Sequence, residues 1–427
     1  MKTRSHTTLT WMFMLMLLTC ISKAGADTSF ANFDARAQKG ERLTVVFFGA
    51  SLTWGANATD PSTTSYRAVM ADRLQDKYPK SSFKFYDAAI GGPGSQLGVF
   101  RLDRDVLRRK PDLVFVDFTA NDDITSNNAD HSASYEAIIR RLVAEAKVPV
   151  VQVLFPFKWN ASATDTKGMP RHAINLAIGK AYGTPVGDAV TLVQQRIKEG
   201  KVKADELWDT DPVHPGDEGY KLFAEAAWNG FEEGVAQKMV PAAPEKMLNA
   251  DTYTHASRVR ISSLYEKGKL PGGWSIGKPS LGAAFHDAVM SRWLDDVVVA
   301  KNYVNVKGAD GKETSTPVTP ARIKAKFNGS VLMLFGEETL DSGTYRVYID
   351  GVAVTRMVKG KTTDIFDASA RNFGGSRHHT QEIAIGLDAT KEHTVEIEPV
   401  FVEGQHQELR IESICVAGGK ATVTPAD

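Results

Sequence analysis

The chain has 427 residues, of which 42% are hydrophobic and 24% are charged. This composition is typical of a folded globular protein and excludes a disordered or low-complexity chain. The 51 Lys and Arg residues balance the 51 Asp and Glu residues, which argues against a basic nucleic-acid-binding protein. The length favours two or three domains.

The first 26 residues have the pattern of a secretory signal peptide. Lys2 and Arg4 give it a positive start, and Leu9–Thr19 is an apolar run too short to span a bilayer comfortably. Ala24-Gly25-Ala26 is the small-residue pattern that signal peptidase recognises. We predict cleavage after about Ala26 and a secreted or periplasmic protein; the alternative is an N-terminal membrane anchor.

Cleavage at this point would change the charge and the cysteine content. It would remove three basic residues and no acidic residue, which leaves a net charge of about −3. Cys415 would be the lone cysteine, so the mature chain could form no internal disulfide and would rely on its core. No later segment has the length of a transmembrane helix, and we expect no membrane association after cleavage.

Residues 43–238 alternate short apolar runs with amphipathic segments. The apolar runs predict strands at 43–48, 83–88, 112–118, 148–155 and 185–186. The amphipathic segments predict helices at 66–78, 97–109, 135–146, 174–182, 189–199 and 219–235. Apolar strands separated by helices indicate a parallel sheet that is covered by helices on both faces.

The stretch Pro241–Pro244 ends this pattern, because two prolines in four residues cannot continue a helix. Beyond it the hydrophobic period becomes 2, and Asp350-Gly351 is a strong hairpin signal. The predicted strands are 330–336, 344–349, 382–387, 393–398 and 408–416. We predict a jelly-roll-like β-sandwich. The expected organisation is a signal peptide at 1–26, an α/β domain at 40–240, a linker at 241–250 and a β-rich accessory domain at 251–427.

Ser51 directly follows the first predicted strand, within Gly49–Gly55. Ligands of open α/β sheets bind beyond the carboxyl ends of the strands, so a serine at this point is a candidate nucleophile. A serine after a strand commonly only caps the next helix, and alone the signal is weak.

Asp211 and His214 lie close together near the end of the same region. A serine hydroxyl needs a base to become a nucleophile, and the base needs an acceptor on its other ring nitrogen. An aspartate three residues before a histidine can supply that acceptor within one turn. The alternative is a helix N-terminus that Asp211 or Asp217 caps, with a solvated histidine.

Two further segments offer hydrogen-bond donors for the charge that acyl transfer builds on a carbonyl oxygen. Gly92 lies in the glycine-rich segment after the second strand, where a backbone N–H can approach a ligand closely. Asn121 follows the third strand and offers a side-chain amide. A glycine turn and an Asx turn are the alternatives.

Together these four blocks, in this order, resemble the SGNH (GDSL-like) hydrolases over about residues 43–238. The resemblance implies a flavodoxin-like three-layer α/β/α domain. It also implies that Ser51 is the nucleophile, His214 the base and Asp211 the residue that orients it. The oxyanion donors would be the backbone N–H groups of Ser51 and Gly92 and the side chain of Asn121.

The sequence departs from the family pattern at two points. Ala50 replaces the acidic residue of the family name, and Thr119 stands where glycine is common, so its side chain could narrow the pocket. We expect Asp122 to hold the loop after the strand in place. No cofactor is expected, because the serine mechanism requires neither a metal nor an organic group. No set of His, Cys, Asp or Glu residues has metal-ligand spacing: the adjacent His378 and His379 would point to opposite faces of a strand and are interpreted as a polar strand edge.

The leading hypothesis is a secreted serine esterase (acetylesterase) that removes O-acetyl groups from a polysaccharide or oligosaccharide, its expected partner. The alternatives are a lipase or lysophospholipase, a sugar O-acetyltransferase, and a carbohydrate-binding protein with a vestigial hydrolase domain. Residues 251–325 could reach back over the Ser51 cleft. The aromatic side chains that could stack on sugar rings, or simply pack in a core, are Trp274, Trp293, Tyr303 and Tyr345.

Overall fold

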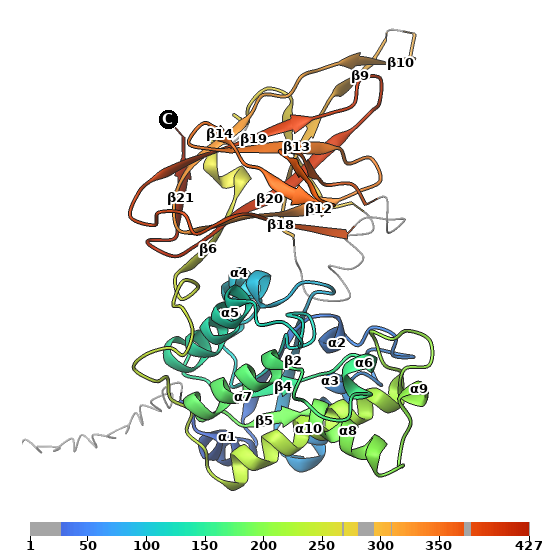
Figure 1. Cartoon of the computed structure of the whole chain (residues 1–427), viewed down its shortest axis with the longest axis vertical. Coiled ribbons are helices and arrows are strands. Elements are labelled where there is room, and N and C mark those ends of the chain that lie inside the picture. Colours follow the sequence, from blue (N-terminus) through green and yellow to red (C-terminus); the bar gives the residue numbers. More distant parts are fainter. Residues whose placement is uncertain (1–26, 267–268, 281–293, 309, 371–376, 427) are drawn as a thin grey trace, which may run out of the picture.

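The structure is a computed structural model that describes residues 27–266, 269–280, 294–308, 310–370 and 377–426. An α/β part and a β part are stacked along the long axis of the molecule (Figure 1). The predicted signal peptide, residues 1–26, lies outside the described residues. In the part of the chain that the structure describes, no helix is long and apolar enough to cross a membrane.

A parallel five-stranded sheet forms the centre of the α/β part, with the strand order β2-β1-β3-β4-β5. Its strands are β1 (Arg42–Gly49), β2 (Ser82–Ala89), β3 (Leu113–Asp117), β4 (Val150–Leu154) and β5 (Val186–Asp188). This is the flavodoxin-like order, so the fold class predicted for this region is confirmed. The order reverses beside β1, which places a crevice at the carboxyl ends of β1 and β3.

Helices cover both faces of this sheet because side chains alternate along each strand. Val46 and Phe48 share a core with one set of helices, and Val45 and Phe47 with another. The first set is α4 (Ser95–Asp105), α5 (Ala129–Arg140) and α7 (Pro170–Tyr182). The second set is α1 (Phe30–Gln38), α3 (Tyr66–Lys77), α8 (Ala189–Lys198) and α10 (Asp217–Ala236).

Helix α1 has no counterpart among the predicted elements. Phe30 and Phe33 of α1 pack against Phe231 of α10, with ring centroids 6.4 and 5.8 Å apart. This contact places α1 in the same core as the sheet, ahead of residue 40. The remaining short helical segments are α2 (Ser51–Trp54), η1 (Leu107–Arg109), η2 (Arg141–Glu145), α6 (Lys158–Ala161), α9 (Ala204–Leu207) and η3 (Ile261–Leu264).

Two antiparallel sheets form the β part, which confirms the predicted β-sandwich. The inner sheet has β6 (Ala256–Arg260), β7 (Trp274–Gly277), β8 (Val297–Lys301), β12 (Val331–Glu338), β18 (Arg377–Ile385) and β20 (Glu408–Ala417). The outer sheet has β11 (Ile323–Asn328), β13 (Thr344–Ile349), β14 (Val352–Ala353), β17 (Phe366–Asp367), β19 (His393–Val400) and β21 (Thr422–Pro425).

Three hairpins complete the β part. Asp350-Gly351 joins β13 to β14, with φ of 51° and 79°, as the hairpin signal predicted. The other two are β9 (Tyr303–Lys307) with β10 (Glu313–Pro317), and β15 (Arg356–Val358) with β16 (Lys361–Thr363).

The central strands of the inner sheet, β8, β12 and β20, are buried on both faces. Leu332 and Leu334 of β12 face the outer sheet and belong to the core of the sandwich. Val331, Met333 and Phe335 of the same strand face the α/β part and share a core with α4 and α5. Figure 1 shows β12 and β18 on the side of the β part that faces these two helices. The two parts are therefore joined through a continuous apolar core.

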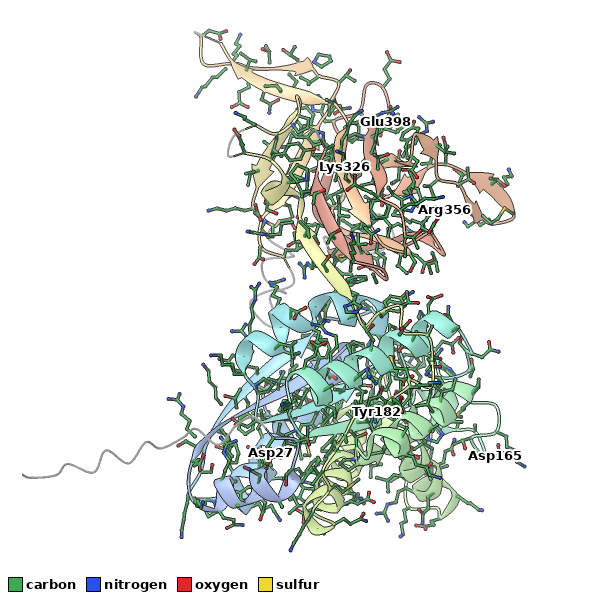
Figure 2. All side chains as sticks on the ribbon, turned by 90° about the vertical axis from the view of Figure 1, so that its left-hand side faces the viewer. Asp27, Asp165, Tyr182, Lys326, Arg356 and Glu398 are labelled. Atoms are coloured by element: carbon green, nitrogen blue, oxygen red, sulfur yellow. The ribbon has the colours of Figure 1, made fainter. Side chains whose placement is uncertain are left out.

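The predicted linker, residues 241–250, lies against α5. The carboxylate of the fully buried Glu136 accepts hydrogen bonds from the backbone N–H groups of Leu248 and Asn249, both at 2.8 Å. It also accepts one from the Tyr182 hydroxyl at 3.0 Å (Tyr182 is labelled in Figure 2). Arg140 donates to the carbonyl of Pro244 at 2.7 Å. The chain between the two parts is thus fixed by hydrogen bonds to one helix.

We expect Glu136→Ala to destabilise the protein by about 3 kcal/mol, because it leaves the N–H groups of Leu248 and Asn249 and the Tyr182 hydroxyl without their acceptor. Equilibrium unfolding in urea, followed by circular dichroism, measures the loss. Glu233→Ala on the exposed side of α10 is the control and should change stability by no more than about 0.5 kcal/mol. Equal stability of the two variants would contradict this account of the linker.

Candidate active site

Ser51 is the first residue of α2, directly beyond the carboxyl end of β1. A Cβ at Gly49 would lie 2.1 Å from the Thr53 hydroxyl, so only glycine allows this tight turn from strand to helix. The first N–H groups of a helix have no acceptor within it, and the N–H of Ser51 is one of them. The Ser51 side chain is mostly buried but lines a cleft, where its hydroxyl can meet a ligand.

His214 and Asp211 lie in the loop between α9 and α10. The Ser51 hydroxyl is 2.9 Å from Nε2 of His214, and Nδ1 of His214 forms a hydrogen bond with the Asp211 carboxylate. Burial tends to raise the pKa of Asp211, but hydrogen bonds from the Val213 N–H and from His214 outweigh it and lower this pKa. The carboxylate is therefore charged at neutral pH and can stabilise a protonated imidazole.

Asn57 is a residue of the site that the sequence analysis did not identify. Its side-chain amide donates to the carbonyl of His214 at 3.1 Å and accepts from the Thr210 hydroxyl at 2.9 Å. It therefore ties the loop that carries the histidine to the segment after α2. Nothing in the sequence pattern around Asn57 indicates this contact, which joins residues 157 positions apart.

Gly92 and Asn121 lie side by side at the ends of β2 and β3. Gly92 has φ of 101°, a conformation that favours glycine, and its carbonyl accepts a hydrogen bond from the Asn121 side chain at 3.2 Å. Both residues line the cleft together with Ser51 and His214. The structure thus brings together all five residues that the sequence indicates.

Asp122 and Thr119 flank Asn121 and face away from the reaction centre. Asp122 accepts from the N–H of Ser95 at 2.7 Å, which holds the start of α4, as its structural interpretation predicts. The expectation that Thr119 narrows the pocket is wrong. Its side chain is buried, accepts a hydrogen bond from Asn175 of α7 at 3.0 Å and does not line the cleft.

The cleft around Ser51 has a volume of about 690 Å³, and both parts of the molecule form its walls. From the α/β part it is lined by Ser51, Trp54, Ala56, Gly91, Gly92, Pro93, Gly94, Gln96, Leu97, Asn121, Val213 and His214. From the β part it is lined by Met333, Glu338, Arg377, His378 and Thr380. Among the described residues, this second wall comes from β12 and β18. Residues 281–293 of the stretch that was expected to reach over the cleft lie outside the described residues, so that expectation stays a prediction.

Three of the four aromatic side chains considered for sugar stacking do not line the cleft. Trp274 and Tyr345 are buried in the sandwich core. Tyr303 stacks on His406 with ring centroids 4.2 Å apart, and Trp293 lies outside the described residues. Within the described ranges, no group of three or more His, Cys, Asp or Glu side chains is arranged to hold a metal ion.

Residues 47–222 match the GDSL-like Lipase/Acylhydrolase family, and the match includes Ser51, Gly92, Asn121, Asp211 and His214. No curated protein matches the sequence. The α/β part is that of an SGNH-type carboxylic ester hydrolase. The α/β part is thus a GDSL-like lipase/acylhydrolase domain.

Solved structures reproduce the two-part architecture. A two-domain esterase active on acetylated mannans, co-crystallised with mannopentaose, is 20% identical and has a TM-score of 0.66, covering 91% of this chain and 94% of that one. The same esterase without the sugar is 19% identical over the same shares, with a TM-score of 0.65. Axe2, an acetylxylan esterase from Geobacillus stearothermophilus, is 21% identical and has a TM-score of 0.38. Its alignment covers 45% of this chain and 96% of the Axe2 chain.

Asp117 is the last residue of β3, and its side chain contacts α2. It accepts a hydrogen bond from the Thr53 hydroxyl at 3.1 Å. Burial raises the pKa of Asp117 to about 8, although the bond from Thr53 opposes the shift. The folded protein therefore holds a neutral carboxyl group beside the turn that presents Ser51.

This burial predicts a pH-dependent stability. The unfolded chain loses the Asp117 proton near pH 3.8 and the folded chain near pH 8, so this group's stabilisation is complete below pH 3.8 and is lost as the pH rises towards 8. Between pH 5 and 8 the loss is roughly 1 kcal/mol per pH unit. Asp117→Asn has no such proton, so urea unfolding should show it gaining stability relative to the wild type as pH rises. A difference that is constant with pH would contradict the assignment.

Proposed function

We propose that this protein is an exported serine esterase that removes O-acetyl groups from a polysaccharide or oligosaccharide. The observation that carries the proposal is the hydrogen-bonded series from Ser51 through His214 to Asp211 at the mouth of a cleft. A serine, an imidazole and a carboxylate in this order are the parts that acyl transfer to and from a serine requires.

The first half of the reaction forms an acyl-enzyme. Nε2 of His214 takes the proton of Ser51 while Oγ attacks the ester carbonyl carbon. The negative charge that develops on the carbonyl oxygen is stabilised by the N–H groups of Ser51 and Gly92 and by the side chain of Asn121. The protonated imidazole, held by Asp211, then gives its proton to the sugar oxygen, and the C–O bond breaks.

The second half returns the enzyme to its starting state. Water occupies the place of the departed sugar hydroxyl and gives a proton to Nε2 of His214 as it attacks the acyl carbon. The tetrahedral intermediate collapses, Ser51 takes its proton back from the imidazole, and acetic acid leaves. One ester and one water thus give one alcohol and one acetic acid, and the protein's own groups suffice for each proton transfer.

The substrate class is supported by the lining of the cleft and by the shared architecture. Arg377 and Glu338 form an ion pair at 2.6 Å, so this wall has no net charge and offers hydrogen bonds, which suits a neutral sugar. The esterase with the same two-domain fold is active on acetylated mannans. The signal-like segment at residues 1–26 supports export, where such polymers are met.

Substitution of the three reacting residues tests the mechanism. We expect Ser51→Ala and His214→Ala to lower kcat/KM for p-nitrophenyl acetate by at least roughly a thousandfold, and Asp211→Asn by a similar factor, because the three groups act as a unit. Ser62→Ala, in the exposed loop before α3, is the matched control and should keep wild-type activity. Wild-type rates in Ser51→Ala would overturn the proposed mechanism.

The preferred acyl group tests the substrate class. We expect kcat/KM for acetyl esters to exceed that for C8 esters by at least about tenfold, because a long acyl chain would have to lie against the paired ions of the cleft wall. A panel of p-nitrophenyl esters and acetylated mannooligosaccharides, assayed for released acetate, measures this. Preference for C8 would indicate a lipase, and transfer of acetyl to an added sugar would indicate a transferase.

A further inference from the structure

The end of the inner sheet forms a wall opposite the reaction centre. Glu338, the last residue of β12, pairs in register with Arg377, the first residue of β18. The apolar face of the inner sheet packs on α4 and α5, and Gln96 of α4 donates to Glu382 of β18 at 3.2 Å. These contacts fix the start of β18 beside the cleft, more than 300 residues from Ser51 in the sequence.

A buried network fixes the orientation of β18 at this point. The buried His379 forms hydrogen bonds with Glu338 at 3.0 Å through Nδ1 and with the Tyr345 hydroxyl at 2.7 Å through Nε2. Glu338 also accepts from Nε of Arg377 at 2.6 Å. Side chains alternate along a strand, so with His379 held in the sandwich, His378 must face the cleft.

The imidazole of His378 lies next to Gly92. A Cβ built on Gly92 would be 3.4 Å from Cε1 of His378 and 3.8 Å from its Nε2. Burial, together with the positive charge of Arg377, lowers the pKa of His378 to about 3. The ring is therefore neutral at physiological pH, with one nitrogen that donates a hydrogen bond and one that accepts.

The position beside Gly92 determines which part of the substrate the ring can meet. When the ester oxygen lies at the Gly92 N–H, the remaining groups on the carbonyl carbon are a methyl group and the sugar oxygen. A methyl group makes no hydrogen bond, whereas the carbon next to the acetylated one carries a hydroxyl that both donates and accepts. A neutral imidazole on this wall matches that hydroxyl.

We propose that His378, contributed by the C-terminal β-sandwich, is a specificity-determining residue that hydrogen-bonds the sugar hydroxyl neighbouring the acetylated position. This inference rests on the proposed function and deepens it. It makes the β-sandwich part of the substrate site, because the chemistry at Ser51 is supplied by one part of the molecule and the recognition of the sugar by the other. A simple acetate ester lacks the sugar hydroxyl and would therefore depend only on the α/β part, which carries Ser51.

The test compares two monoacetylated methyl mannosides, one intact and one in which the hydroxyl neighbouring the acetyl group is replaced by hydrogen. The wild type should prefer the intact sugar by at least about tenfold in kcat/KM, because a site built to bond a hydroxyl rejects an analogue that lacks it. His378→Phe keeps a ring but has no polar nitrogen, and this preference should fall to about twofold or less. His378→Gln, which keeps a donor and an acceptor, should restore most of it.

The controls separate this role from a structural one. His406→Ala, an exposed histidine of the same sandwich that does not line the cleft, should keep the wild-type preference. A general disturbance of the site would lower the rates for both sugars without changing their ratio, so an unchanged ratio in His378→Phe overturns the inference.

If the wild type hydrolyses p-nitrophenyl acetate but neither sugar, the proposed substrate class fails and the inference fails with it. If it deacetylates both sugars equally, only the inference fails.

Discussion

The burial of the central strands of the inner sheet on both faces is the constraint on which the rest of the structure depends. Along β12, Leu332 and Leu334 pack into the sandwich while Met333 and Phe335 pack on the α/β part. Each fully buried side chain of this size contributes about 1.5–3 kcal/mol relative to an exposed one. Separation of the two parts would therefore expose one face of the strands β8, β12 and β20. The relative position of the two parts is set by core packing, and the cleft between them is fixed with it.

The second requirement is that polar groups from distant segments meet at one edge of the parallel sheet. The turns after β1, β2 and β3 all open at that edge, which brings Ser51, Gly92 and Asn121 together. His214 comes from a loop before α10, and two contacts hold that loop: Asp211 from within and Asn57 from the segment after α2. Each reacting group is thus placed by backbone that the core already fixes, and a substrate need not order it on binding.

The sequence predicts the parts of this arrangement that depend on local pattern. The hydrophobic period and the turn residues are sufficient to predict the doubly wound sheet, the sandwich and the Asp350-Gly351 hairpin. The residues that come together in the cleft, from Ser51 to His214, were also predicted, because each follows a strand or begins a helix within a recognisable block. Helix α1 was missed because its apolar residues are few and become meaningful only through their contact with Phe231.

What the sequence does not predict is which surface a strand meets. Residues 331–335 are apolar without interruption, which indicates burial on both faces but does not identify the partner surface. For the same reason the sequence favours a polar strand edge for His378 and His379. The strand β18 is indeed at the edge of its sheet, but this edge forms one wall of the cleft. The alternation that separates the two histidines was predicted correctly. Only tertiary packing decides that one of them joins a buried network and the other faces Gly92, so the same dipeptide both anchors the wall of the cleft and presents a polar group to it.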